Sequence, residues 1–134
     1  MQIVTDSGTD LSLTPEQMSE LNIHLAPLSV TLDGQTYREG LDIEPEDFYS
    51  LLEASGNLPT TSQPSGGELA DIYRELATSD PDILSIHISS GLSGTTNAAR
   101  LAASLVTEAD VTVVDTKTLS AAAGWQVEIG RPHV

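Results

Sequence analysis

In the stretch ILSIHISSGLSGTT, residues 83–96, an apolar run changes abruptly into small hydroxyl residues and glycines. An alanine-rich segment, residues 97–105, follows at once. This order predicts a strand, then a tight loop, then the start of a helix. Such a junction directs unpaired backbone N–H groups and the positive end of a helix dipole toward one place. The stretch therefore predicts a site for an anion such as a phosphate or a carboxylate.

Strands and helices alternate on either side of this stretch. The apolar patterns predict further strands at residues 3–5, 23–26, 28–32, 35–38 and 111–114. Capping residues and helical spacing predict helices that begin near residues 14, 44, 65 and 119. Asp33-Gly34 joins two alternating segments, which predicts a hairpin. The whole order indicates an α/β fold, with a mainly parallel sheet and helices on both of its faces.

Polar loops follow three of the predicted strands, at residues 6–8, 89–94 and 115–116. The carboxyl ends of parallel strands meet at one edge of a sheet, so these loops should converge there. Residues 58–67 contain two prolines and two glycines and are expected to form no regular structure. Ser65 should cap the next helix, with Glu68 completing a capping box. Within this loop, residues 60–65 are rich in hydroxyl groups, which fits either a ligand-binding loop or an ordinary connection.

Composition limits the possible functions. The 134 residues suit one domain, and 20 acidic residues against five basic ones give a net charge of −15. That charge argues against nucleic acid and against anionic membrane surfaces as partners. The chain has no cysteine, which excludes disulfides and thiol chemistry, and its acidic residues do not match a calcium-binding loop. We expect no metal and no cofactor. With no signal peptide and no membrane anchor in the sequence, we expect a cytoplasmic protein.

Two enzyme classes compete for the same strand ends. A hydrolase would use Ser93 as its nucleophile, but the motif is one residue short of Gly-x-Ser-x-Gly, and His87 is expected to pack and hydrogen-bond within its strand. A phosphatase of the haloacid-dehalogenase type would use Asp6, but the second aspartate of that signature is missing. The simpler interpretation is that Ser93 and Thr95 cap a helix and that Asp6 belongs to a polar turn.

The chain carries four short motifs: Thr-Asp-Ser with Asp-Leu at residues 5–11, Thr-Ser-Gln-Pro-Ser at 61–65, the loop Ile-Ser-Ser-Gly-Leu-Ser-Gly-Thr at 88–95, and Val-Asp-Thr at 114–116. Together these four motifs resemble the DegV family of bacterial fatty-acid-binding proteins. The second and third motifs are each fairly specific, and they lie about thirty residues apart in the expected order. The resemblance extends over residues 2–127.

The resemblance implies a carrier that is not an enzyme. Members of the family hold one long-chain fatty acid in an apolar tunnel and present its carboxylate to a partner fatty acid kinase. By resemblance, Thr61, Ser93 and the backbone amide of Gly94 hold the carboxylate, and the fold is the N-terminal lobe of a two-lobed protein related to a domain of dihydroxyacetone kinases. We also expect Ser62 in this site.

Two further expectations concern the edge of the site and the length of the chain. Asp6 and Ser7 are expected to line the same edge of the sheet as the carboxylate-binding residues. Members of the family are about twice as long as this chain, so residues 1–134 correspond to a single N-terminal lobe without the second one. A third reading, beside carrier and enzyme, is that the exposed face of this lobe pairs with another copy to form a homo-oligomer.

Overall fold

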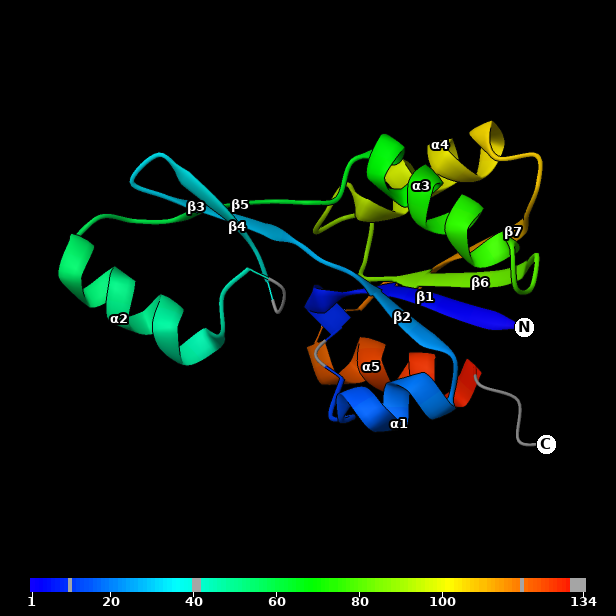
Figure 1. Cartoon of the computed structure of the whole chain (residues 1–134), viewed down its shortest axis with the longest axis horizontal. Coiled ribbons are helices and arrows are strands. Elements are labelled where there is room, and N and C mark those ends of the chain that lie inside the picture. The colour runs from blue at the N-terminus through cyan, green and yellow to red at the C-terminus, as the bar shows by residue number, and fades with distance from the viewer. Residues whose placement is uncertain (10, 40–41, 119, 131–134) are drawn as a thin grey trace.

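The structure is a computed structural model that describes residues 1–130 apart from 10, 40–41 and 119. Figure 1 shows a main lobe, which contains the first and the last elements of the chain, and a smaller unit that extends away from it. The elements, in chain order, are β1 (Gln2–Asp6), η1 (Ser7–Thr9), α1 (Pro15–Glu20), β2 (Ile23–Ala26), β3 (Ser29–Leu32), β4 (Gln35–Arg38), α2 (Pro45–Ser55), β5 (Thr60–Ser62), α3 (Gly66–Ala77), β6 (Asp82–His87), α4 (Thr95–Leu105), β7 (Asp110–Asp115) and α5 (Ser120–Gly130).

The main lobe is built on a parallel sheet of four strands in the order β2-β1-β6-β7. The two inner strands are β1 and β6, and Ile3 of β1 pairs with Ile23 of β2 and with Leu84 of β6. Helices α3 and α4 cover one face of the sheet, and α1 and α5 cover the other (Figure 1). The predicted α/β fold, with a mainly parallel sheet and helices on both faces, is confirmed.

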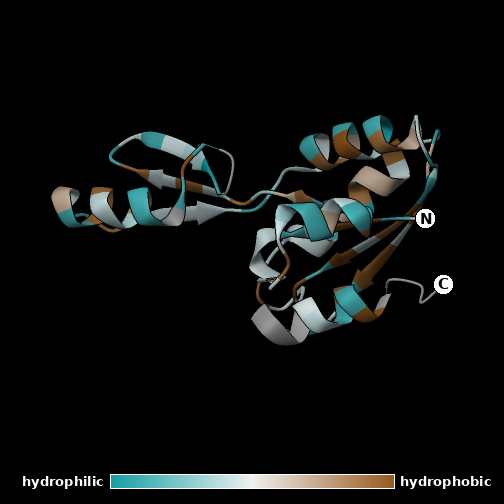
Figure 2. Ribbon diagram, turned by 60° about the horizontal axis from the view of Figure 1, so that its bottom comes forward, coloured by the Kyte–Doolittle hydropathy of each residue, from teal (hydrophilic) through white to brown (hydrophobic). Residues whose placement is uncertain are grey.

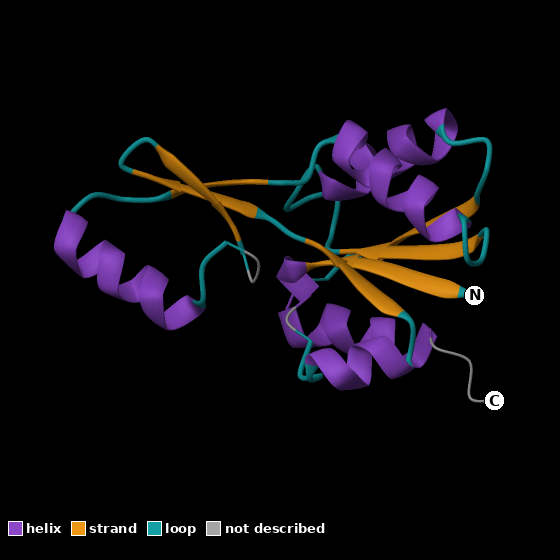
Figure 3. Cartoon of the chain, in the orientation of Figure 1, coloured by secondary structure: helices purple, strands orange, loops and turns teal. Residues whose placement is uncertain are grey.

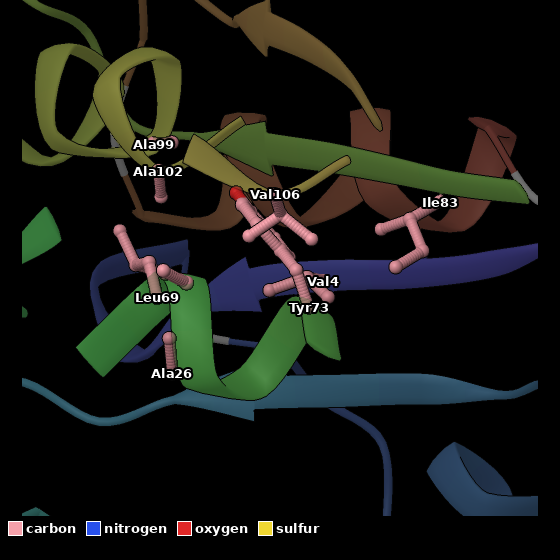
Figure 4. Close-up of a cluster of buried hydrophobic side chains, with 9 residues drawn as sticks. Val4, Ala26, Leu69, Tyr73, Ile83, Ala99, Ala102 and Val106 are labelled. Atoms are coloured by element: carbon pink, nitrogen blue, oxygen red, sulfur yellow. The ribbon is translucent and has the colours of Figure 1, made fainter. Parts of the chain in front are cut away.

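Each face of the sheet has its own apolar core, because side chains alternate along a strand. Val4 of β1 points to the α3 and α4 side, where it packs with Leu69 and Tyr73 (Figure 4). Ile3 points the other way and packs with Ile86 and Val127. These side chains are at most 3% exposed, and burying each one contributes about 1.5–3 kcal/mol. The main lobe therefore has a two-sided core that holds the strand ends in place.

The smaller unit is a three-stranded antiparallel sheet, in the order β4-β3-β5, with α2 beside it (Figure 3). Strands β3 and β4 are joined by Asp33 and Gly34, whose φ values are 52° and 80°. A turn with positive φ at both central residues matches the twist of a hairpin, and glycine adopts such a φ without strain. The hairpin predicted from Asp33-Gly34 is confirmed.

The expectation that residues 58–67 form no regular structure is wrong. Thr60, Thr61 and Ser62 form β5, which pairs with β3, and α3 already begins at Gly66. The prolines and glycines of this segment lie outside β5, so they interrupt no hydrogen bond of the ladder. Threonine favours a strand because its branched side chain fits the pleated surface.

The predicted helix starts agree with the structure, with one shift. Thr14 caps α1 and Ser65 caps α3, and both form capping boxes, with Gln17 and Glu68 respectively. Helix α4 begins at Thr95, two residues before the alanine-rich segment. Among the residues that the structure describes, no helix is both long enough and apolar enough to span a membrane. The predicted start at residue 119 lies outside the described residues, and α5 is described from Ser120.

Candidate functional site

Hydrogen bonds hold the three predicted loops together at the carboxyl edge of the parallel sheet. Asp6 Oδ2 accepts a bond from the amide of Ile88 at 3.3 Å, which joins the ends of β1 and β6. The backbone amide and the hydroxyl of Ser90 both donate to Asp115 at the end of β7. These donors, the hydroxyl of Ser90 above all, lower the pKa of Asp115. The convergence of loops 6–8, 89–94 and 115–116 is confirmed.

A single side chain connects the two motifs that lie about thirty residues apart. Gln63 Oε1 accepts a hydrogen bond from the backbone amide of Gly94 at 3.2 Å. A Cβ atom on Gly94 would collide with the side-chain amide of Gln63, so a larger residue there would push this amide aside. An amide oxygen thus occupies the position from which a bound carboxylate oxygen would accept the same N–H. Gln63 was not among the predicted ligand-binding residues, although it lies within the same polar run as Thr61.

Ser93 stands at the start of α4, where the helix N-terminus presents backbone N–H groups. Its hydroxyl bonds to Thr95 Oγ1 at 2.8 Å and accepts from the Thr95 amide at 3.2 Å. The N-cap position belongs to Gly94, which has no side chain to cap the helix. Ser93 is half-buried, and among the described residues its hydroxyl bonds to Thr95 rather than to a histidine. This geometry supplies a hydrogen-bond donor at a helix start and lacks the base that a serine nucleophile requires.

Thr61 and Ser62 are both exposed on β5, but they lie on opposite faces of the small sheet. In the β3–β5 ladder Thr61 stands opposite Val30, whereas Ser62 stands opposite Ser29. Residues directly opposite each other share one face of a sheet, and neighbours along a strand alternate between faces. The two hydroxyl groups therefore cannot both face the same ligand from within the strand.

A buried chain of hydrogen bonds lies beneath these loops. His87 joins its Nδ1 to Asp6 Oδ2 at 2.9 Å and its Nε2 to Ser85 Oγ at 2.7 Å, and Ser85 bonds to the hydroxyl of Tyr73 at 2.6 Å. All four residues have zero relative exposure. Burial raises the pKa of Tyr73, so its hydroxyl keeps its proton and can donate. An imidazole ring that donates from Nδ1 to Asp6 and accepts at Nε2 from Ser85 satisfies the hydrogen bonds of His87.

The hydrogen bonds among Ser85, His87 and Asp6 connect the same residue types as a Ser–His–Asp catalytic triad, but no substrate can reach them. Ser85 and His87 are fully buried inside the main lobe, so neither can reach a bound molecule. The Asp6 carboxylate also accepts from the amide of Gly8 at 2.9 Å, as well as from Ile88. The network therefore fixes the loops that follow β1 and β6. The prediction that His87 packs and hydrogen-bonds within its strand is confirmed.

Asp6 and Ser7, which were expected to line one edge together, face different surroundings. The side chain of Asp6 is buried and directed at His87, so its carboxylate does not reach a ligand-accessible surface, and a nucleophilic role is incompatible with this position. Ser7 donates to Glu39 Oε2 at 2.7 Å and accepts from the amide of Leu28 at 3.1 Å. Ser7 thereby ties the end of β1 to the small unit, and it borders a cavity between the two.

The cavity beside Ser7 has a volume of about 350 Å³, near the lower limit for ligand pockets. Its remaining walls are Leu25, Val30, Glu39, Ile43, Phe48 and Tyr49, which come from β2, β3, α2 and the segments beside β4 and α2. We call it the α2 cavity. Among the described residues, no three histidine, aspartate or glutamate side chains gather closely enough to hold a metal ion.

The protein is thus an α/β lobe that carries hydroxyl groups and backbone amides at the carboxyl edge of its parallel sheet, and this lobe is joined to a small antiparallel sheet. The sequence pattern of the family described as "Uncharacterised protein, DegV family" matches residues 1–130. The chain belongs to the DegV family, which confirms the resemblance noted from its motifs.

The curated relatives differ in length. A DegV domain-containing protein of Staphylococcus aureus strain N315 is 44% identical over 126 residues, which are 94% of this chain and 44% of that protein. The chain therefore spans less than half the length of this relative. A DegV domain-containing 15.5 kDa protein of Staphylococcus aureus is 42% identical over 126 residues, and in that case the match covers 87% of the relative.

Solved structures of DegV proteins share the fold. A structure described as fatty acid binding of a DegV family protein from Thermus thermophilus superposes with a TM-score of 0.83 at 38% identity, covering 97% of this chain and 45% of the other. DegV from Bacillus subtilis, described as a fatty acid binding protein, gives a TM-score of 0.86 at 38% identity, with coverages of 94% and 44%. These neighbours are thus proteins described as binding fatty acids.

Proposed function

We propose that this chain binds a long-chain fatty acid, without catalysis, and presents its carboxylate to a partner fatty acid kinase. The observation that carries the proposal is the hydrogen bond from Gly94 to Gln63, because it brings the two family motifs side by side. The fatty-acid-binding proteins among the solved neighbours support the choice of ligand. The buried position of Asp6 and His87 supports a role that is not enzymatic.

We assign the carboxylate to a seat made by Thr61, Ser93 and the backbone amide of Gly94. The exposed hydroxyl of Thr61 and the helix start at Ser93 provide donors on two elements that Gln63 joins. On binding, the carboxylate displaces Gln63 Oε1 from the Gly94 amide. Ser62, on the opposite face of β5, is left outside the seat.

The acyl chain supplies most of the affinity in this proposal. A hydrogen bond to a charged group contributes roughly 1.5–3 kcal/mol, whereas burying each methylene contributes about 0.8 kcal/mol. A long chain therefore gains more from apolar walls than from the seat. The seat selects a carboxylate and orients it.

The test compares a fatty acid with the alcohol of the same length. Ser93→Ala should weaken palmitate binding by about tenfold, the loss of one hydrogen bond to a charged group, and should weaken 1-hexadecanol binding much less. Displacement of a fluorescent fatty acid from the purified chain measures both ligands. Ser104→Ala, at an exposed serine near the end of α4, is the matched control. Equal losses for acid and alcohol would remove Ser93 from the seat.

Native mass spectrometry addresses the other readings. A co-purified molecule whose mass fits a fatty acid of roughly 16–18 carbons would support the carrier hypothesis, because burial of a long acyl chain favours its retention. A ligand-free dimer would favour the self-associating lobe instead. The kinase part of the proposal requires that acyl phosphate forms only when chain, fatty acid, ATP and a fatty acid kinase are combined.

A further inference from the structure

A surface groove of about 380 Å³ lies where the smaller unit joins the main lobe. Two connections meet there, the chain between β2 and β3 and the chain between β5 and α3 (Figure 1). Leu25 at the end of β2, Pro27 and Pro64 in the connections, and Ile72 of α3 form an apolar wall. Leu25 is 42% exposed, so this wall is open to water. We call this feature the α3 groove.

One rim of the α3 groove is a row of carboxylates on α3. Glu68, Asp71 and Glu75 line the groove and are exposed, and they follow one another at intervals of three and four residues. At that spacing, side chains stand one above another on the same helix face. The hydrophilic bands of α3 alternate with hydrophobic ones (Figure 2). Like charges at this spacing repel each other, and a cation placed along the row would remove that repulsion.

The nearby arginines do not neutralise this rim. Arg38 of β4 also lines the groove, but its guanidinium donates to both carboxylate oxygens of Asp42, at 3.1 and 3.0 Å. Asp71 forms an ion pair with Arg74 at 3.3 Å, which is exposed and therefore weak. In the part of the chain that the structure describes, the carboxylate of Glu75 accepts no hydrogen bond and forms no ion pair. The rim thus keeps charge that a partner can use.

The neighbouring histidine adds no positive charge at neutral pH. Burial lowers the pKa of His24, and this effect exceeds the opposite effect of Glu75. Since the ordinary pKa of histidine is about 6.5, His24 is neutral at pH 7. An anion that approaches the α3 groove therefore meets negative charge, which sets this groove apart from the carboxylate seat.

We propose that the α3 groove docks a basic segment of a partner protein. An apolar side chain of that segment rests on Leu25 and Ile72, and its lysine or arginine side chains lie along the carboxylate row. Charge complementarity selects this occupant, because an acidic rim beside an apolar wall fits a segment that combines positive charge with an apolar anchor. The exposed walls suit a segment laid along the surface. The inference is independent of lipid binding.

The first test changes the charge of the rim. The probe is a fluorescein-labelled peptide with one leucine between two pairs of lysines, and fluorescence anisotropy measures its affinity for the chain at about 0.15 M salt, where distant charges are screened. Asp71→Asn combined with Glu75→Gln removes two exposed carboxylates four residues apart on α3. Glu16→Gln combined with Glu20→Gln removes two at the same spacing on α1, on the other face of the sheet. We expect about fivefold weaker binding for the α3 pair, from the loss of two exposed ion pairs, and unchanged binding for the α1 pair.

The second test concerns the apolar wall. A peptide with alanine in place of its leucine should bind the unsubstituted chain about fivefold more weakly, roughly the effect of one methylene returned to water. Leu25→Ala should remove most of this difference between the two peptides, because the anchor loses its contact. Leu58→Ala, at a leucine that is 93% exposed and does not line the groove, is the matched control and should retain the difference.

The outcomes distinguish a docking site from simpler explanations. Loss of binding in the α3 pair alone, together with a preference for leucine that depends on Leu25, supports the proposal. If both pairs of substitutions weaken the peptide equally, the net charge of the chain attracts it, and the proposal is wrong. It is also wrong if the unsubstituted chain does not bind the leucine peptide, or if spermidine, a cation without an apolar anchor, binds as tightly as that peptide.

The test is separate from that of the proposed function. Neither Asp71 nor Glu75 belongs to the carboxylate seat, so the α3 pair should displace the fluorescent fatty acid with palmitate as the unsubstituted chain does. Lipid binding without peptide binding would overturn the docking site alone, and peptide binding without lipid binding would overturn the proposed function alone.

Discussion

At the scale of single residues, the fully buried Asp6 is the group that fixes the loops around the site. Its carboxylate accepts hydrogen bonds from His87 and from the amides of Gly8 and Ile88. A buried charge is tolerated only when such partners replace the water that it has lost. From the sequence, Asp6 was predicted to line the accessible edge of the site. In the structure its carboxylate instead holds the start of the loop that contains Ser93 and Gly94.

Substitutions at the two ends of this hydrogen-bond network should lower the stability of the fold by different amounts. His87→Leu leaves Asp6 buried with one donor fewer and should lower the free energy of unfolding by about 3 kcal/mol or more. Tyr73→Phe removes only the outermost hydrogen bond, because Ser85 can still donate to His87, and should cost about 1 kcal/mol. Urea unfolding of both variants measures the difference. If both variants lowered the free energy of unfolding by similar amounts, Asp6 would not be the centre of the network.

At the scale of elements, α3 begins immediately after the polar run that carries Thr61 and Gln63. Ser65 accepts from the amide of Glu68 at 3.1 Å, and Glu68 accepts from the amide of Ser65 at 2.7 Å. This reciprocal pair satisfies two donors that a helix start would otherwise leave free. The cap therefore also fixes the end of β5, where the proposed seat begins.

Ser65→Ala should destabilise the chain by about 1 kcal/mol, the usual cost of losing a helix cap. Ser104→Ala is the control, because Ser104 lies inside α4 and only donates to the carbonyl of Leu101. Its effect should stay within about 0.5 kcal/mol, as for most surface substitutions. Thermal unfolding followed by circular dichroism compares the two. A larger loss for Ser104→Ala would contradict the assigned cap.

At the scale of the whole molecule, the net charge of −15 opposes the compact state through repulsion. Raising the ionic strength from about 0.01 M to about 1 M shortens the screening length from about 30 Å to about 3 Å. We expect the unfolding temperature to rise with sodium chloride and to rise equally with choline chloride. A lower unfolding temperature in salt would mean that attractive ion pairs outweigh the repulsion.

The family and the parallel sheet could be predicted because their signals are local. The apolar run before residue 89, the capping residues Thr14 and Ser65, and the turn at Asp33-Gly34 each specify their own element. Strand β5 was missed, because its ladder depends on pairing with the distant β3 and its short run lies among prolines and glycines. The opposite orientations of Thr61 and Ser62 follow from that same ladder.

The α/β class, the converging loops and the membership of the DegV family follow from the amino-acid sequence alone, because strand and helix periodicity and short motifs are encoded by neighbouring residues. Three features became known only from the folded chain: Asp6 is buried, Gln63 reaches Gly94, and a cavity lies beneath α2. These features depend on contacts between residues that are far apart in the sequence, 31 positions for Gln63–Gly94 and 81 positions for Asp6–His87. Such contacts are set by how whole elements pack, and no local pattern encodes them.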